Sequence, residues 1–69
     1  MRYSQQREII LNLIQSTKIH PTADWIYNNA KTYIPKISLG TVYRNLKQLE
    51  QDKLIATIYD GNVARYDSN

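Results

Sequence analysis

The segment from Ser38 to Asp52 has the clearest helical pattern in this sequence. Ser38 precedes the first leucine and is a candidate N-cap, because its hydroxyl can accept a hydrogen bond from a free N–H of the first turn. At about 100° per residue, one face is apolar and consists of Leu39, Val42, Leu46 and Leu49. The opposite face carries Gly40, Thr41, Arg44, Lys47, Gln48 and Gln51. We therefore expect this helix to lie with its leucines on a core and its donors and acceptors outside.

Two further helices are predicted upstream. Ser4 is a candidate N-cap, and the spacing of the apolar residues after it predicts a helix over residues 5–15. Thr22 is the next candidate cap. We expect the helix that it starts to end near Tyr33, because Pro35 lacks a backbone donor and disfavours a helical residue before it.

The last part of the chain has the pattern of a β-hairpin. Residues 54–59 are β-branched and aromatic, Asp60-Gly61 is a strong turn pair, and residues 63–66 can return. A lone two-stranded ribbon is marginal in water, so we expect it to pack on the helices and to gain a short third strand from Lys36-Ile37. These elements predict a mainly α domain with a small antiparallel β hairpin, the winged helix-turn-helix architecture.

Size and composition limit the function classes. The chain has 69 residues, a formal charge of +3, one histidine and no cysteine, and so short a chain buries one core. Few arrangements of an acid, a base and a substrate cavity are available, so we expect no enzyme. Thiol nucleophiles and cysteine-ligated zinc are excluded from these residues. No apolar run approaches a membrane span, and we expect a soluble, cytoplasmic domain without a membrane partner.

The polar face of the helix over residues 38–52 fits major-groove DNA recognition. Arg44 can donate two hydrogen bonds to guanine O6 and N7, and Lys47 and Gln48 can contact bases or phosphates. Thr41 adds a hydroxyl to this face, and a pI near 9.3 favours a polyanionic partner. The same residues also suit an ordinary solvated helix face, and the pattern alone leaves the two interpretations about equal.

Three more residues are candidates for contact with DNA. Tyr43 lies at the margin of the apolar face, where its ring can rest on the core while its hydroxyl reaches a phosphate or its edge meets a thymine methyl. A buried, hydrogen-bonded core tyrosine is the alternative. Arg2 and Arg7 flank the first helix cap, where a cationic arm and a helix N-terminus can meet the DNA backbone. Taken singly, each is equally an ordinary surface arginine.

His20 is the single imidazole and directly precedes Pro21, which predicts an extended backbone at His20. A lone histidine is more often a surface or cap residue than a metal ligand, since useful coordination takes three or more ligands. Asp67 can be a second ligand if the hairpin folds it back towards His20. Such a pair would bind a metal weakly.

Several ordered motifs resemble the ferric uptake regulator family. They are His-Pro-Thr-Ala-Asp-Trp-Ile-Tyr at 20–27, Pro-Lys-Ile-Ser-Leu-Gly-Thr-Val-Tyr-Arg-Asn-Leu at 35–46, Ala-Arg-Tyr-Asp at 64–67, and Ser-Gln-Gln-Arg at 4–7. The resemblance implies a bacterial metal-dependent or peroxide-responsive repressor, in which a winged-helix half is joined to a C-terminal dimerisation half. It further implies that residues 1–69 are the winged-helix DNA-binding domain and that the dimerisation and metal-sensing domain is absent from this chain, as in a fragment.

The resemblance also assigns roles to residues. Tyr43 and Arg44 match positions that meet DNA bases, Arg2 matches a basic residue placed in an A/T-rich minor groove, and Arg7 matches a contact to the DNA backbone. The implied partner is double-stranded DNA with an A/T-rich inverted repeat, and the implied full-length form is a homodimer.

For the metal, the resemblance makes His20 and Asp67 part of a regulatory site whose other ligands lie outside this chain. It implies Fe²⁺ or Mn²⁺ at that site and Zn²⁺ at a structural site of the full-length protein, with no metal bound tightly by these residues alone. Aspartate at position 67 favours a peroxide sensor, whereas Arg44 is more typical of iron-sensing members.

Trp25 departs from the family, which usually has an acid there. It falls outside the Ile26 face, so we expect it to cover the hinge or a partner domain, or to be an exposed peculiarity of this chain. The sequence therefore predicts the sequence-specific DNA-binding domain of a metal-dependent or peroxide-responsive bacterial repressor, with the helix from Ser38 to Asp52 in the major groove. The alternative is a winged helix for protein interaction, which an exposed Trp25 would favour.

Overall fold

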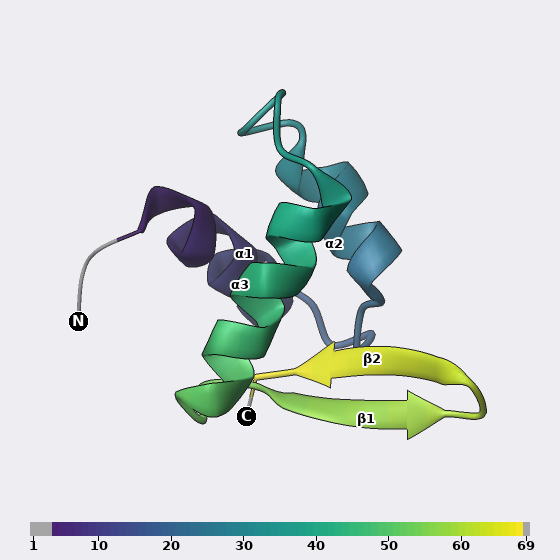
Figure 1. Cartoon of the computed structure of the whole chain (residues 1–69). Coiled ribbons are helices and arrows are strands. Elements are labelled where there is room, and N and C mark those ends of the chain that lie inside the picture. The colour runs from purple at the N-terminus through teal and green to yellow at the C-terminus, as the bar shows by residue number, and fades with distance from the viewer. Residues whose placement is uncertain (1–3, 69) are drawn as a thin grey trace.

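The computed structural model describes residues 4–68, which form three helices followed by a two-stranded antiparallel sheet. The elements are α1 (Gln5–Gln15), α2 (Ala23–Ala30), α3 (Leu39–Gln51), β1 (Ala56–Asp60) and β2 (Val63–Asp67). The helices pack against one another, and the hairpin extends beneath them beside the end of α3 (Figure 1). This is the predicted winged helix-turn-helix. No helix among residues 4–68 has the length and apolar character needed to cross a membrane.

All three helices begin at the predicted caps. The side-chain oxygens of Ser4, Thr22 and Ser38 each accept a hydrogen bond from the backbone N–H three residues later, at 3.2, 3.2 and 3.1 Å. The second helix ends earlier than the prediction near Tyr33. The N–H groups of Tyr33 and Ile34 both donate to the carbonyl of Ala30, at 3.0 and 2.8 Å, so the chain tightens into turns after Ala30.

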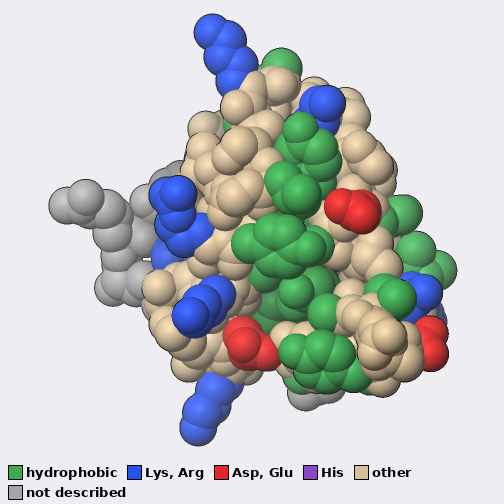
Figure 2. Space-filling view, turned by 45° about the vertical axis from the view of Figure 1, so that its right-hand side comes forward, with side chains coloured by type: hydrophobic (Ala, Val, Ile, Leu, Met, Phe, Trp, Pro, Cys, Tyr) green, Lys and Arg blue, Asp and Glu red, His purple; other side chains and the backbone are tan. Residues whose placement is uncertain are grey.

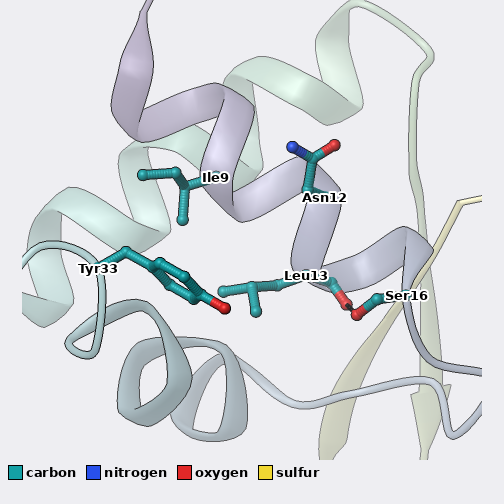
Figure 3. Close-up of a pocket in the computed structure, with 5 residues that line it drawn as sticks. All are labelled: Ile9, Asn12, Leu13, Ser16 and Tyr33. Carbon is teal, nitrogen blue, oxygen red and sulfur yellow. Dashed lines mark hydrogen bonds between the residues drawn. The ribbon is translucent and has the colours of Figure 1, made fainter.

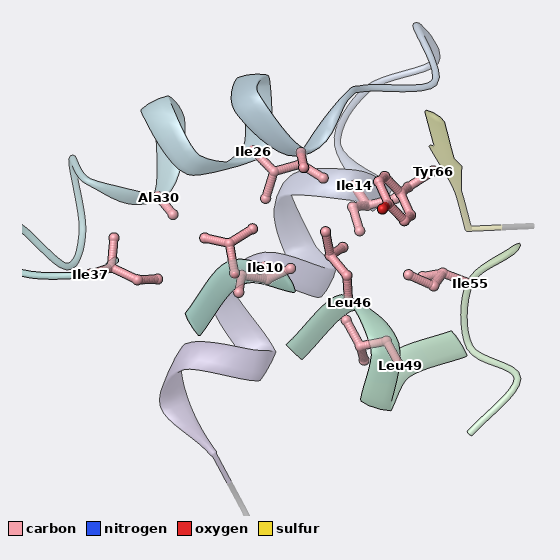
Figure 4. Packing of buried hydrophobic residues seen from close by; sticks show 11 residues of the cluster. Ile10, Ile14, Ile26, Ala30, Ile37, Leu46, Leu49, Ile55 and Tyr66 are labelled. Carbon is pink, nitrogen blue, oxygen red and sulfur yellow. The ribbon is translucent and has the colours of Figure 1, made fainter. Parts of the chain in front are cut away.

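One hydrophobic core joins the helices to the hairpin (Figure 4). Its buried members are Ile10, Ile14, Ala23, Ile26, Ala30, Ile37, Val42, Leu46, Leu49, Ile55 and Tyr66. The predicted apolar face of α3 is thus buried except at Leu39, which is the first residue of the helix and remains 36% exposed. Burial of the rest of this face orients α3 and leaves its opposite side on the surface.

The hairpin is anchored in this core by Tyr66, which is 7% exposed. Asp60 pairs with Val63, so the two-residue turn is Gly61-Asn62, one position later than the predicted pair Asp60-Gly61. Gly61 has φ +64°, the sign required at the first central position of a type II′ turn. The turn therefore depends on glycine.

The prediction of a third strand from Lys36-Ile37 is wrong. Within residues 4–68 the sheet has two strands, and Ile37 is buried in the core. A different segment lies along β2: Thr22 forms a bridge with Arg65, and the N–H of Tyr66 donates to the carbonyl of Pro21 at 2.9 Å. Those contacts support the ribbon in place of the expected strand.

The prediction of an extended His20 is also wrong, because its φ is +54°, in the left-handed region. This residue departs from the local preference before proline at a point where it contacts β2: the carbonyl of His20 accepts a hydrogen bond from Arg65 Nη1 at 3.1 Å. Trp25 is half-buried and packs against the core. This removes the fully exposed tryptophan that would have favoured a protein-interaction module.

Candidate nucleic-acid interface

The outer face of α3 carries two cations that are not engaged elsewhere in the described part of the chain. Arg44 and Lys47 are exposed, and neither side chain makes a hydrogen bond or ion pair within residues 4–68. The burial of Val42 and Leu46 on the opposite side of the same turns fixes the direction in which they project. The donors of the Arg44 guanidinium therefore have no partner among residues 4–68.

Two other predicted residues of this face already have partners. Ser38 Oγ donates to the hydroxyl of half-buried Thr41 at 2.9 Å, which places Thr41 in the helix cap. Gln48 Nε2 donates to Asp52 Oδ1 at 3.2 Å, so its amide is tied to the end of α3. Contact between DNA and the Gln48 amide nitrogen would compete with this bond, whereas the Gln48 amide oxygen has no partner among the described residues.

Tyr43 stands at a groove of about 290 Å³ between α3 and the hairpin. The groove is lined by Tyr43, Leu46, Lys47, Glu50, Thr57, Tyr59 and Tyr66. Tyr43 is 50% exposed, which rules out a fully buried core tyrosine. Burial raises the pKa of Tyr66 above its ordinary value of 10.0, with smaller contributions from Tyr43, Glu50 and Tyr59, so Tyr66 is a neutral wall of the groove at physiological pH.

The surface beside α3 combines apolar and cationic character. Figure 2 shows a band of hydrophobic side chains with basic side chains along one flank and at both ends, and with acidic side chains beside it on both flanks. Exposed hydrophobic residues of the molecule include Leu39, Tyr43, Tyr59 and Val63. A protein surface that binds DNA combines apolar side chains, which contact sugars or thymine methyls, with cations, which contact phosphates.

The remaining predicted DNA contacts lie at the beginning of the chain. Arg7 is half-buried in the first turn of α1, where its N–H donates to the Ser4 cap. Arg2 lies outside the described residues. The structure therefore tests neither predicted contact.

The hairpin does fold Asp67 back towards His20. Asp67 Oδ1 lies 3.7 Å from His20 Nε2, although the two residues are 47 positions apart. Asp67 ends β2, and His20 lies in the segment that runs along that strand. The two side chains predicted as metal ligands are thus neighbours at the surface.

Their chemistry fits part of a metal site. Metal bonds of about 2.0–2.2 Å separate neighbouring donor atoms by roughly 3–3.5 Å, close to the distance seen here. Imidazole and carboxylate also suit Mn²⁺, Fe²⁺ and Zn²⁺. Within residues 4–68 no group of three or more histidine, cysteine, aspartate or glutamate side chains is gathered, so this pair would need ligands from elsewhere.

Sequence reasoning missed residues at both of these sites. Glu50, Thr57 and Tyr59 line the groove beside Tyr43, and Arg65 contacts the carbonyl of His20. Side chains two residues apart in a strand share a face, so the sequence could have predicted that Arg65 lies on the same face as Asp67. The groove depends on how the hairpin folds against α3, which no local pattern contains.

A second pocket, of about 270 Å³, lies between α1 and the turn after α2 (Figure 3). It is lined by Ile9, Asn12, Leu13, Ser16 and Tyr33. None of the predicted site residues lies in it, so the outer face of α3 remains the candidate interface.

Residues 1–69 match the sequence profile described as the ferric uptake regulator family. The chain belongs to the ferric uptake regulator family. Among its curated relatives, the peroxide-responsive repressor PerR of Staphylococcus aureus (strain USA300) is 34% identical over 70 residues, which cover 100% of this chain and 47% of PerR. The chain spans about half the length of the curated relatives it matches.

Solved structures of the family have the same fold. PerR from Streptococcus pyogenes superposes with a TM-score of 0.90 at 31% identity, over 99% of this chain and 48% of that one. A manganese uptake regulator superposes with a TM-score of 0.87, also at 31% identity, over 100% of this chain and 52% of that one. The three helices and hairpin are therefore the winged-helix DNA-binding domain of this family of regulators.

Proposed function

We propose that this chain is the sequence-specific DNA-binding domain of a metal-dependent or peroxide-responsive bacterial repressor, with α3 in the major groove. The main support is Arg44, exposed and unengaged within residues 4–68 on a helix whose other face is buried. Arg44 reads guanine, Tyr43 contacts a thymine methyl or a phosphate, and Lys47 binds phosphate or base. Gln48 and Thr41 contribute polar contacts after adjustment of their present partners.

The first helix and the hairpin brace the DNA on either side. Arg7 contacts the backbone near the start of α1, and Arg2 enters the minor groove of an A/T-rich inverted repeat. Such a repeat needs two copies of the domain, held together in a homodimer by segments beyond these residues. A single copy has low affinity, since tethering two binding modules raises avidity by a factor of about 10² or more.

Fluorescence anisotropy tests the DNA-binding role. The chain is titrated onto a labelled A/T-rich inverted-repeat duplex and onto a scrambled duplex at several salt concentrations. We expect tighter binding to the repeat, and a log–log salt slope of about −0.9 for each phosphate neutralised. A flat salt response, or equal affinity for both duplexes, rejects sequence-specific DNA binding.

We further propose that His20 and Asp67 supply two ligands of a regulatory site for Fe²⁺ or Mn²⁺ in the full-length protein, with structural Zn²⁺ held elsewhere. The 3.7 Å approach of the two side chains supports this role. The peroxide-responsive and manganese-uptake regulators are equally similar to this chain, at 31% identity, so both signals belong to the proposal. A bound metal would fix β2 to the segment before α2.

A further inference from the structure

The guanidinium of Arg65 connects the hairpin to the loop that carries His20. Arg65 Nη1 donates a hydrogen bond to the carbonyl oxygen of His20 at 3.1 Å. On its other side, Arg65 Nε lies 3.4 Å from Asp60 Oδ2 near the hairpin turn. One side chain therefore bridges the hairpin turn and the loop before α2.

The left-handed backbone of His20 needs to be stabilised by contacts with other parts of the chain. Its φ of +54° is unusual for a residue with a Cβ, and Pro21 restricts the residue before it further. The next residues are held by main-chain contacts, because Pro21 accepts from the N–H of Tyr66 and Thr22 bridges Arg65. At His20 itself, the hydrogen bond from Arg65 is the contact that the described structure provides to the main chain.

The same strand carries Asp67. Arg65 and Asp67 are two residues apart in β2 and so lie on one face of the hairpin. The left-handed backbone of His20 brings its imidazole to within 3.7 Å of the Asp67 carboxylate on that face. Arg65 thus holds the backbone of one member of the pair from a position beside the other.

We propose that Arg65 is a positioning residue, which fixes the backbone of His20 so that its imidazole faces the carboxylate of Asp67 before any metal arrives. As far as it concerns metal binding, this inference rests on the proposed regulatory site. Loss of Arg65 releases His20 towards the extended backbone that a residue before proline prefers. The two ligands then have to be brought together at the moment of binding, which lowers their affinity for a metal.

NMR spectroscopy of this chain tests the proposal first without metal. The ¹³Cα and ¹³Cβ shifts of His20 report its backbone, and a contact between its ring and the side chain of Asp67 reports the pair. We expect Arg65→Met to move the His20 shifts to extended values and to lose the contact. Asp60→Asn is the matched control: it removes the ion pair at the turn but keeps the bond to His20, so its shifts should be those of the wild type.

Arg65→Lys is a second, conservative variant, which keeps the test valid if Arg65→Met does not fold. Lysine can still donate one hydrogen bond to the His20 carbonyl, so we expect shifts between those of the wild type and of Arg65→Met, with the amide dispersion of a folded domain. Left-handed shifts and an intact His20–Asp67 contact in Arg65→Met overturn the proposal. The same shifts in Arg65→Met and Asp60→Asn overturn it as well.

Titration with Mn²⁺ separates this inference from the proposed metal role. In the wild type, the signals of His20 and Asp67 should broaden before those of other carboxylates, and Arg65→Met should need about fivefold more Mn²⁺ for the same broadening. If no selective broadening occurs in the wild type while Arg65→Met still displaces His20, the metal role fails and the positioning role stands. If selective broadening is unchanged in Arg65→Met, the positioning role fails.

Discussion

The hydroxyl of Thr57 in β1 donates a hydrogen bond to the carboxylate of Glu50 in the last turn of α3. This bond joins the proposed recognition helix to the hairpin and holds a negative charge at the groove that Lys47 also lines. A carboxylate at this place fixes the hairpin through Thr57, but its charge disfavours the binding of a phosphate group. At the proposed interface we therefore expect Glu50 to limit affinity for DNA while it stabilises the hairpin.

Glu50→Gln should therefore raise affinity for DNA of any sequence. Glutamine keeps an oxygen for Thr57 but removes the charge, and two exposed charges about 4 Å apart in water interact by about 1 kcal/mol. We expect a gain of about twofold to fivefold on repeat and scrambled duplexes, measured by anisotropy. Glu8→Gln in α1 makes the same change in charge beside the proposed backbone contact Arg7 and gives a gain for comparison. No gain for Glu50→Gln would show that the groove does not approach phosphate.

Arg44→Ala should reduce discrimination more than affinity for DNA in general. Loss of a bidentate contact to guanine costs about 1–3 kcal/mol on the correct sequence and little on a scrambled one. The ratio of the two affinities is the quantity to measure. Arg7→Ala should weaken binding to both duplexes similarly, and an equal loss on both for Arg44→Ala would refute its base-reading role.

Lys53→Gly should stabilise the domain. Lys53 has φ +62° at the end of α3, where the N–H of Leu54 donates to the carbonyl of Leu49 and that of Lys53 to the carbonyl of Glu50, both at 3.0 Å. Glycine is the usual residue at this position of a helix end. We expect a gain of about 1 kcal/mol and a rise in Tm of roughly 4–8 °C. Lys47→Gly in the middle of α3 should instead lose about 1 kcal/mol.

Stability should fall at high pH because of Tyr66. Burial raises the pKa of this phenol above 10.0, so the unfolded chain loses the proton at a lower pH than the folded chain does. Its contribution to the free energy of unfolding is intact below about pH 10 and declines as the pH rises towards the folded pKa. Urea denaturation at a series of pH values should show less decline in Tyr66→Phe. Tyr33→Phe, at an exposed residue, should behave as the wild type.

Calorimetry with Mn²⁺ or Zn²⁺ should detect no tight site on these residues. His20 and Asp67 would supply two ligands, and no group of three histidine, cysteine, aspartate or glutamate side chains gathers within residues 4–68. We expect a dissociation constant well above the micromolar range. Submicromolar binding would mean that a further ligand had been overlooked, and His20→Ala would then show whether the histidine belongs to that site.

Local chemistry was sufficient to predict where the helices begin. The caps at Ser4, Thr22 and Ser38 and the apolar face of α3 are short-range features, and the structure contains them with the expected hydrogen bonds and burial. The approach of Asp67 to His20 was also foreseen, on the condition that the hairpin folded back. The hairpin turn was misplaced by one residue, since Asp60 pairs with Val63.

Two of the errors arose where distant segments meet. His20 has a left-handed φ, and its carbonyl accepts a hydrogen bond from Arg65, 45 residues away. Ile37 is buried rather than paired, since the main chain at Thr22 occupies the side of β2 instead. A sequence pattern that spans only a few residues contains no information about such contacts. For the same reason the groove at Tyr43 and the bond between Thr57 and Glu50 were not foreseen.

Thr22 has two functions in the fold. Its side chain caps α2 through the N–H of Trp25, and its main chain forms the bridge to Arg65 in β2. The strand therefore cannot swing away without also fraying the first turn of that helix. A displacement of the hairpin is therefore transmitted directly to the start of α2, and β2 and the first turn of α2 move together.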